Sequence, residues 1–127
     1  MTTRTVLYIE DNEFNRKIVR QLLARTSYRL MEAVDGESGV AMATEHAPDL
    51  VLMDVQLPKL SGLDATRAIR NDPRTAHVPV IVVTSFALSG DESKAMAAGA
   101  SAYLAKPYSP RELMALIRRF APEETMA

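Results

Sequence analysis

Three short runs of consecutive apolar residues place the strongest limit on what this chain can fold into. They occupy residues 6–9, 50–53 and 80–83, and each run gives way at once to polar or turn-forming residues. A short continuous apolar run with such boundaries is typical of a strand that is buried on both faces, as in a parallel sheet covered by helices. The sequence therefore favours an α/β fold.

Two further strands and five helices complete the predicted pattern. The clearest helix start is at Ser109, which is followed by Pro110 and Glu112 in the pattern of a capping box. In the first helix, Phe14, Ile18 and Leu22 recur every fourth residue and form one apolar face. The expected strands cover residues 6–9, 28–34, 50–53, 80–83 and 102–105. The expected helices cover residues 13–25, 38–46, 62–71, 91–98 and 109–120.

Regular alternation of strands and helices predicts a doubly wound, five-stranded parallel sheet with helices on both faces. The second strand contains Arg29 and Glu32, and the fifth strand contains small residues. Such residues suit the edges of a sheet, whereas the three apolar strands suit its centre. The expected strand order is therefore 2-1-3-4-5.

The composition is that of one ordinary domain. The chain has 127 residues, with a core expected over 4–120 and a loose tail over 121–127. A net charge of −1 argues against direct DNA binding, and the absence of Cys excludes disulfides and cysteine nucleophiles. No apolar run approaches membrane-spanning length, and acidic residues follow the first strand too early for a signal peptide. A single cytoplasmic domain over 1–127 is expected.

Chemically active side chains follow four of the predicted strands. Glu10 and Asp11 follow the first strand, Asp54 the third, Thr84 the fourth and Lys106 the fifth. Because the carboxyl ends of parallel strands share one edge of the sheet, these side chains are expected to meet in one crevice. Each has an ordinary structural explanation alone, but their common position favours a functional site.

Carboxylates that lie this close repel one another, and a hard cation relieves the repulsion. Oxygen ligands without imidazole or thiolate suit Mg²⁺. A carboxylate near Mg²⁺, with an ammonium and a hydroxyl beside it, is equipped to accept a phosphoryl group and become an aspartyl phosphate.

With these residues in place, the chain resembles the response-regulator receiver domains, the CheY-like modules of two-component signalling. Within that family it is most similar to single-domain DivK-type regulators and to receivers of hybrid histidine kinases. The resemblance covers residues 4–120 and implies a flavodoxin-like fold. The motifs that carry it are Glu10-Asp11, Asp54-x-x-x-Pro58-x-x-x-Gly62, Thr84, Tyr103 and Lys106-Pro107.

The resemblance implies a role for each position. Asp54 is the phosphoacceptor, and Mg²⁺ is bound by Asp11, Asp54 and the backbone carbonyl of Gln56, with Glu10 acting through water. Lys106 pairs with the phosphoryl oxygens.

The resemblance also implies a switch. Thr84 moves to hydrogen-bond the phosphoryl group and Tyr103 turns inward behind it. Two departures from the family pattern stand out: Glu10 replaces the commoner Asp, and Ser85 replaces a smaller residue. A cis peptide bond before Pro107 is also expected from the resemblance.

The implied partners are a histidine kinase or histidine phosphotransfer protein as donor and a downstream protein as target. The target is expected to bind a face made by residues 91–98, 102–105 and 109–120, with Phe86, Ala87 and Leu88 beside it. Neither DNA nor a membrane is an expected partner.

Two alternatives compete with a stand-alone regulator. The first is a receiver domain excised from a hybrid histidine kinase or larger regulator. The second, which the sequence favours less, is an Asp-nucleophile phosphohydrolase. A phosphohydrolase of the haloacid dehalogenase type needs a general acid two residues after its nucleophile, where this chain has Gln56. A phosphoacceptor that is not a turnover enzyme is therefore favoured.

Overall fold

Strands and helices alternate throughout the computed structural model, which describes residues 3–84, 91–106 and 108–123. The strands are β1 (Thr5–Ile9), β2 (Arg29–Ala33), β3 (Leu50–Asp54), β4 (Val80–Thr84) and β5 (Ala102–Ala105). The helices are α1 (Glu13–Leu23), α2 (Gly36–His46), α3 (Gly62–Asn71), α4 (Asp91–Ala98) and α5 (Pro110–Phe120).

The five strands form one parallel sheet in the order β2-β1-β3-β4-β5, which confirms the predicted fold class and strand order. Every residue of β3 and β4 is buried, whereas β2 and β5 are partly exposed. The wholly apolar strands therefore lie at the centre of the sheet, as their composition predicts.

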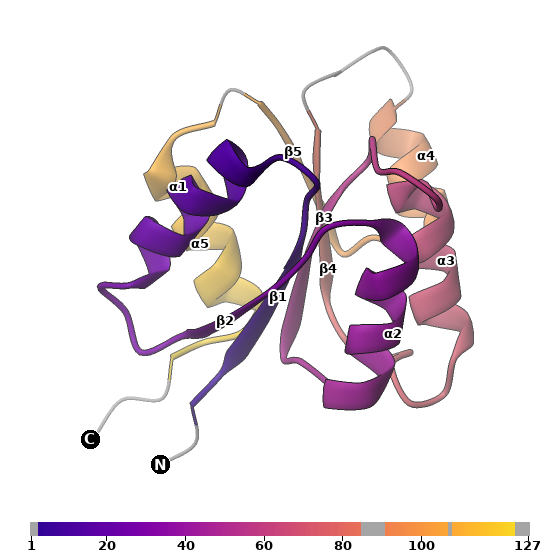
Figure 1. Cartoon of the computed structure of the whole chain (residues 1–127), viewed down its shortest axis with the longest axis horizontal. Helices are drawn as coiled ribbons and strands as arrows, with labels where there is room; N and C mark the ends of the chain where they lie inside the picture. The colour runs from indigo at the N-terminus through magenta and orange to yellow at the C-terminus, as the bar shows by residue number, and fades with distance from the viewer. Residues whose placement is uncertain (1–2, 85–90, 107, 124–127) are drawn as a thin grey trace.

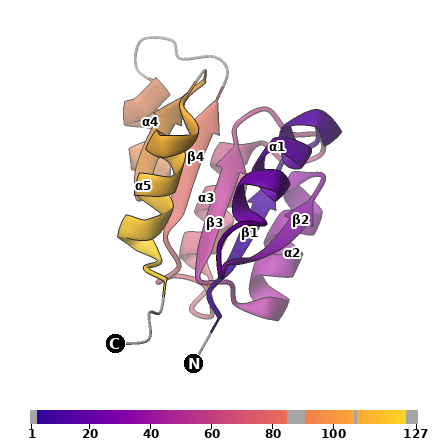
Figure 2. The same ribbon diagram turned by 90° about the vertical axis from the view of Figure 1, so that its left-hand side faces the viewer.

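Helices cover both faces of the sheet. Figures 1 and 2 show α1 and α5 on one face and α2, α3 and α4 on the other. One hydrophobic cluster, which includes Tyr8, Leu52 and Ile117, fills the layer beneath α1 and α5. A second cluster, which includes Met53 and Ile69, fills the opposite layer. Successive residues of a strand point to opposite faces, so each central strand supplies both clusters.

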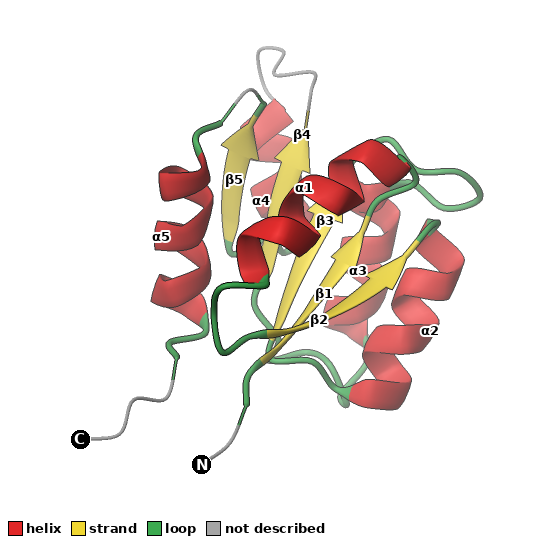
Figure 3. Ribbon diagram, turned by 60° about the vertical axis from the view of Figure 1, so that its left-hand side comes forward, coloured by secondary structure: helices red, strands yellow, loops and turns green. Residues whose placement is uncertain are grey.

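All five strands run in the same direction, and Figure 3 shows their carboxyl ends along one edge of the sheet. Ile9 of β1 is the register partner of Met53 in β3, and Asp54 is that of Val83 in β4. Glu10 therefore comes directly after the β1 residue that neighbours Met53, beside Asp54. Thr84 in turn pairs with Ala105, next to Lys106.

Helix starts agree with the sequence signals except at α2. Ser109 caps α5 and forms the predicted capping box with Glu112. The predicted start of α2 at Ser38 is wrong, because Asp35 caps the helix two residues earlier by accepting a hydrogen bond from the Ser38 amide at 2.7 Å. Gly36 is required there, since a Cβ would lie 2.1 Å from the Leu60 carbonyl oxygen.

The apolar spacing in α1 misidentifies its buried face. Val19 and Leu23 are the buried residues of this helix, whereas Phe14 is 69% exposed and Ile18 is 43% exposed. Leu22 packs against the first cluster only in part. The apolar stripe that begins at Phe14 therefore faces solvent at its amino-terminal end.

Some expectations fall on positions outside the described residues: Ser85, the segment 86–88 and the bond before Pro107. Of the helices in the described ranges, none combines the length and apolar character needed to cross a bilayer.

Candidate functional site

Asp54 is the last residue of the central strand β3 and is 7% exposed. Leu50 and Leu52 precede it on the same face of the strand, and both belong to the cluster beneath α1 and α5. The Asp54 carboxylate therefore continues an apolar row and points toward the α1 side of the sheet. This position combines burial with access from the carboxyl edge.

Three carboxylates converge at this edge. Glu10, Asp11 and Asp54 each offer an oxygen, and the three oxygens lie within 4.8 Å of one another. Glu10 and Asp54 are buried, whereas Asp11 is exposed. An all-oxygen donor set of this kind fits a hard cation such as Mg²⁺, which keeps several waters and needs few protein ligands.

The carboxylate of Glu10 is held by several donors. Its Oε1 atom accepts hydrogen bonds from the Tyr8 hydroxyl at 3.3 Å, the Asn15 side-chain amide at 3.0 Å and the Lys106 ammonium at 3.0 Å. Its Oε2 atom accepts one from the Asn12 backbone amide at 3.3 Å. Glu10 thus joins β1, the start of α1 and the end of β5.

The pKa values of the two buried carboxyl groups, Asp54 and Glu10, are shifted in opposite directions. Burial and the neighbouring charge of Glu10 raise the pKa of Asp54 from 3.8 to about 7. Burial acts in the same direction on Glu10, but its hydrogen bond to Lys106 and the charge of that ammonium outweigh burial and lower its pKa. The pKa of Asp11 is also raised, by partial loss of hydration and by its hydrogen bond with Glu10 and the charge of that residue, although the Asp11 side chain is exposed. Glu10 is therefore the carboxylate that stays ionised, whereas ionisation of Asp54 is made unfavourable by burial and by the charge of Glu10.

Lys106 reaches the site as predicted, and its ion pair there is with Glu10 at 3.0 Å. Its side chain is 16% exposed. The ammonium lies beside the three carboxylates and offsets part of their repulsion.

Thr84 and Tyr103 lie toward the other layer. Val80 and Val82 precede Thr84 on the same face of β4 and belong to the cluster beneath α2, α3 and α4. Tyr103 pairs in register with Val82 and packs against that same cluster, with its hydroxyl buried. The expected switch residues thus share one face of the sheet, and the carboxylates occupy the other.

The loop after β3 returns closely to Asp54. The Gln56 side chain is exposed, whereas Gly62 is buried at the start of α3 and donates a backbone hydrogen bond to the Val55 carbonyl at 2.9 Å. A Cβ at Gly62 would lie 1.9 Å from the Asp54 carbonyl oxygen. The Gly in the Asp54-to-Gly62 motif is therefore a packing requirement of the site.

Sequence reasoning missed three residues that support Glu10. They are Tyr8 and Asn15, which contact its carboxylate, and Arg16, whose guanidinium donates to its backbone carbonyl at 2.8 Å. The sequence signal for Asn15 was the run Glu-Asp-Asn-Glu-x-Asn. In this run Asn12 caps α1, and Asn15 lies three residues after the cap, in the first turn of the helix.

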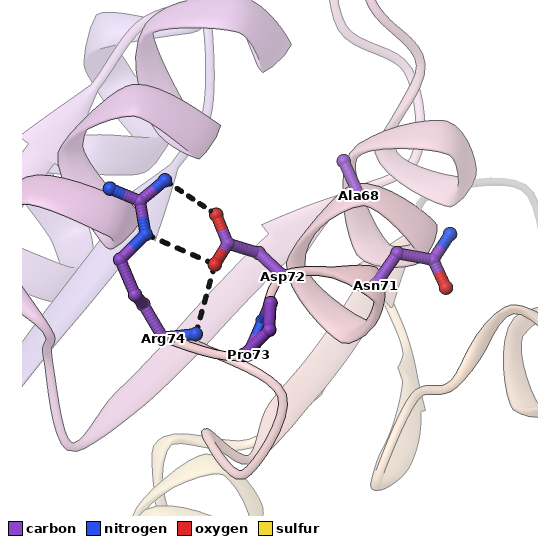
Figure 4. A pocket seen from close by; sticks show the side chains of 5 residues that line it. All are labelled: Ala68, Asn71, Asp72, Pro73 and Arg74. Atoms are coloured by element: carbon purple, nitrogen blue, oxygen red, sulfur yellow. Dashed lines mark hydrogen bonds and ion pairs between the residues drawn. The ribbon is translucent and has the colours of Figure 1, made fainter.

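A separate shallow pocket lies at the carboxyl end of α3, and Figure 4 shows the side chains that line it. It is lined by Ala68, Asn71, Asp72, Pro73 and Arg74. Its two charged side chains bind each other, since Arg74 donates to both Asp72 oxygens at 3.1 and 2.8 Å. The pocket therefore offers no uncompensated charge for a ligand.

Comparison with known proteins matches nearly the whole chain. The family model described as the response regulator receiver domain matches residues 6–118. The polar-differentiation response regulator DivK of Brucella ovis is 40% identical over 118 residues, which cover 93% of this chain and 96% of that protein.

Solved structures agree. The receiver domain of the sensor histidine kinase PA1611 from Pseudomonas aeruginosa PAO1 is 36% identical, with a TM-score of 0.86 over 94% of this chain and 98% of that one. That structure has a magnesium ion coordinated in its active-site cleft. The chemotaxis protein CheY4 of Vibrio cholerae is 25% identical, with a TM-score of 0.87 over 94% and 99% of the two chains.

Proposed function

The chain belongs to the response regulator receiver domain family, and from this premise we propose that Asp54 is its phosphoacceptor. One observation carries the proposal: Asp54 is a buried carboxylate at the carboxyl end of the central strand, with two further carboxylates beside it and the Lys106 ammonium close by. A carboxylate in this setting receives a phosphoryl group and passes on the resulting change in charge.

The proposed donor is a phosphohistidine of a histidine kinase or of a histidine phosphotransfer protein. A carboxylate oxygen of Asp54 attacks the phosphorus atom, and the new O–P bond forms as the P–N bond breaks. The histidine nitrogen leaves with the bonding electron pair and takes up a proton. Lys106 then leaves Glu10 to pair with the phosphoryl oxygens, and the Thr84 hydroxyl donates a hydrogen bond to the same group.

Asp11, Asp54 and the backbone carbonyl of Gln56 would hold Mg²⁺, and Glu10 would contact it through water. The bound ion supplies positive charge that offsets the negative charge gathered on the phosphoryl oxygens. The donor set of Glu10, Asp11 and Asp54, with oxygens within 4.8 Å of one another, supports this assignment.

We propose that the phosphodonor docks over the start of α1. Phe14 and Ile18 are exposed there, in the first two turns after the carboxylate-bearing end of β1. Exposed large apolar side chains beside a reacting group are typical of a protein-binding surface. Phe14→Ala is expected to slow transfer from a phosphorylated protein donor while leaving transfer from acetyl phosphate unchanged. Equal slowing with both donors would contradict a docking role.

The proposed output surface comprises α4, β5 and α5. Support comes from Met96, which is 45% exposed on α4, and from Tyr103, which connects β5 with the layer beneath that helix. A cytoplasmic phosphoacceptor that binds a target protein, without steady turnover, is the function we assign. The alternative of a receiver within a hybrid histidine kinase draws support from the likeness to the PA1611 receiver.

The decisive experiment is incubation with acetyl phosphate and Mg²⁺, followed by intact mass measurement. The wild type is expected to gain one phosphoryl group, and Asp54→Asn is expected to gain none. Asp64→Asn is the matched control, because Asp64 is an exposed carboxylate that pairs with Arg67 and does not belong to the carboxylate cluster. Phosphorylation of Asp54→Asn at the wild-type rate would refute the assignment.

A further inference from the structure

The contacts of Glu10 define an arrangement that the phosphoacceptor role alone does not explain. Three donors converge on Oε1: the Tyr8 hydroxyl, the Asn15 amide and the Lys106 ammonium. Among the described residues one N–H donor, the Asn12 backbone amide, reaches Oε2, and the side chains of Asp11 and Asp54 lie close to the same carboxylate. Since a carboxylate oxygen has about two lone-pair sites, Oε1 is fully used, and Oε2 keeps capacity for a further partner.

We propose that Asn15 is a positioning residue that, together with Tyr8, fixes Glu10 as the resting partner of Lys106 and turns the Oε2 atom of Glu10 toward the metal site. The proposal rests on the proposed function for the consequence in phosphoryl transfer, but the geometry of Glu10 and Lys106 is testable without any phosphodonor.

Asn15 is itself held in place by the start of α1. Its backbone amide donates to the Asn12 side chain at 3.0 Å, which is the amino-terminal cap of the helix. The side-chain amide then points back to Glu10, five residues earlier. The Asn residues of the run Glu-Asp-Asn-Glu-x-Asn thus have separate tasks: Asn12 starts the helix, and Asn15 uses that helix to hold Glu10.

Tyr8 holds Glu10 from the core side. It is two residues before Glu10 on the same face of β1, and it is 1% exposed within the cluster beneath α1 and α5. Its hydroxyl lies at the end of an otherwise apolar layer and donates to Glu10. A buried phenol at this point has one side fixed by packing and the other by the carboxylate.

The length of Glu10 is part of the arrangement. Its carboxylate bridges from the Asn15 amide on α1 to the Lys106 ammonium beyond β5, at 3.0 Å on each side. An Asp at this position is shorter by one carbon–carbon bond, about 1.5 Å, and cannot keep both contacts. Glu10 and Asn15 are therefore expected to act as a matched pair.

If the contact between Glu10 and Asn15 is broken, the Lys106 side chain has an alternative position. A pocket lined by Asn15, Ile18, Lys106, Tyr108 and Pro110 lies directly beside the ammonium-bearing side chain. With Glu10 fixed, the ammonium stays over the carboxylates. With Glu10 free to turn, the flexible Lys side chain gains access to that pocket.

The test is a double-mutant cycle read by Mg²⁺ titration in the absence of phosphodonor. Asn15→Leu keeps the size of the side chain and removes the donor, and Glu10→Asp shortens the carboxylate. Asn15→Leu is expected to weaken Mg²⁺ binding roughly tenfold in the wild type, as is common for partners that orient a metal ligand. In the Glu10→Asp background it is expected to have less than about a twofold effect, because the contact is already lost.

Gln21→Leu is the matched control, since it makes the same chemical change at an exposed position of α1. It is expected to leave Mg²⁺ affinity unchanged. Tyr8→Phe removes only the hydroxyl and is expected to act in the same direction as Asn15→Leu. Asn15→Ala serves as the second variant, with thermal melting to verify folding.

Nitrogen-detected NMR of the Lys106 ammonium provides an independent readout. Its signal is expected to broaden or shift in Asn15→Leu and to stay in place in Gln21→Leu. Equal losses of Mg²⁺ affinity in both Glu10 backgrounds, or an unchanged affinity and Lys106 signal in Asn15→Leu, would overturn the proposal. Neither result depends on phosphorylation, so a failure here and a failure of Asp54 as phosphoacceptor are distinguishable.

Discussion

At the residue scale, the site stores unfavourable charge at Asp54. Its carboxyl group is buried beside the carboxylate of Glu10, and both effects raise its pKa to about 7. Glu10 escapes this penalty because Lys106 donates to it at 3.0 Å. Burial thus makes the charge of Asp54 unfavourable, and a cation bound beside it would offset that charge.

Removal of this charge is expected to stabilise the protein. In the unfolded chain Asp54 loses its proton near 3.8, whereas in the folded state it keeps the proton up to about pH 7. Between these values the folded protein binds more protons, so the free energy of unfolding falls as pH rises. Asp54→Asn is expected to flatten this fall and to raise the free energy of unfolding by about 2 kcal/mol at alkaline pH without Mg²⁺.

Urea unfolding at several pH values measures both quantities. Asp64→Asn is the control, because that carboxylate is exposed and pairs with Arg67. An Asp54→Asn variant less stable than the wild type at alkaline pH would show that the ionised Asp54 carboxylate does not destabilise the fold.

At the element scale, α3 fixes the position of Asp54 through a close approach to the end of β3. The capping Ser61 starts the helix, and Gly62 then lies against the Asp54 backbone, where a Cβ would be 1.9 Å from its carbonyl oxygen. The neighbouring atoms are backbone atoms, which cannot rotate away as a side chain can.

Gly62→Ala is therefore expected to destabilise the fold by about 1–3 kcal/mol and to weaken Mg²⁺ binding, because the helix and the strand end must separate. Thermal or urea unfolding and Mg²⁺ titration measure the two effects. Arg67→Ala, on the exposed side of the same helix, is expected to change stability by less than about 1 kcal/mol and to leave Mg²⁺ affinity intact. If Gly62→Ala has the stability and the Mg²⁺ affinity of the wild type, the close approach of Gly62 to the Asp54 carbonyl is not a constraint on the site.

Elements with strong local signals were predictable, and those decided by tertiary contacts were not. The capping box at Ser109 and the apolar strands at the centre of the sheet depend on local chemistry, and the structure confirms them. The start of α2 was missed because Asp35 can end a strand or cap a helix, and the structure shows that its side chain caps the helix by accepting from the Ser38 amide. The exposure of Phe14 was likewise invisible, since periodicity identifies an apolar face without saying what covers it.

The candidate site shows the same division. Parallel strands of known order bring Glu10, Asp54 and Lys106 together, so their convergence followed from topology. Which carboxylate pairs with Lys106 depends on side-chain reach and on the donors around Glu10. The contacts of Tyr8 and Asn15 needed three-dimensional coordinates, because neither residue type announces such a role.

At the scale of the whole molecule, a cation at the carboxyl edge would connect segments from distant parts of the chain. Mg²⁺ that binds only the folded state is expected to raise the melting temperature. At a concentration 100 times its Kd it raises the free energy of unfolding by about 2.7 kcal/mol. Asp11→Ala is expected to abolish this gain, since it removes the exposed member of the carboxylate group. A melting temperature that ignores millimolar Mg²⁺ would refute the metal site.

The sheet separates the carboxylates from the proposed switch residues. The carboxylates and Lys106 lie on the side of α1 and α5, whereas Thr84 and Tyr103 face the layer of α2, α3 and α4. Under the proposed function, phosphorylation of Asp54 would have to act across the plane of the sheet to reach the proposed output surface at α4. Thr84 is the residue we propose for this step, because it ends β4 next to the register position of Asp54.

Beryllofluoride, a phosphoryl mimic, is accordingly expected to change amide signals beyond the crevice, in α4 and β5. Movement of the Thr84 hydroxyl toward the mimic would alter the layer that holds Tyr103, and bistable packing would carry the change to the surface. NMR shift mapping over residues 91–105 measures this response. Thr84→Ala is expected to bind the mimic but to lose most of the shifts in that range, while Thr44→Ala, on α2, keeps them. Shifts confined to the carboxylates, or a full response in Thr84→Ala, would contradict a signal that crosses the sheet through Thr84.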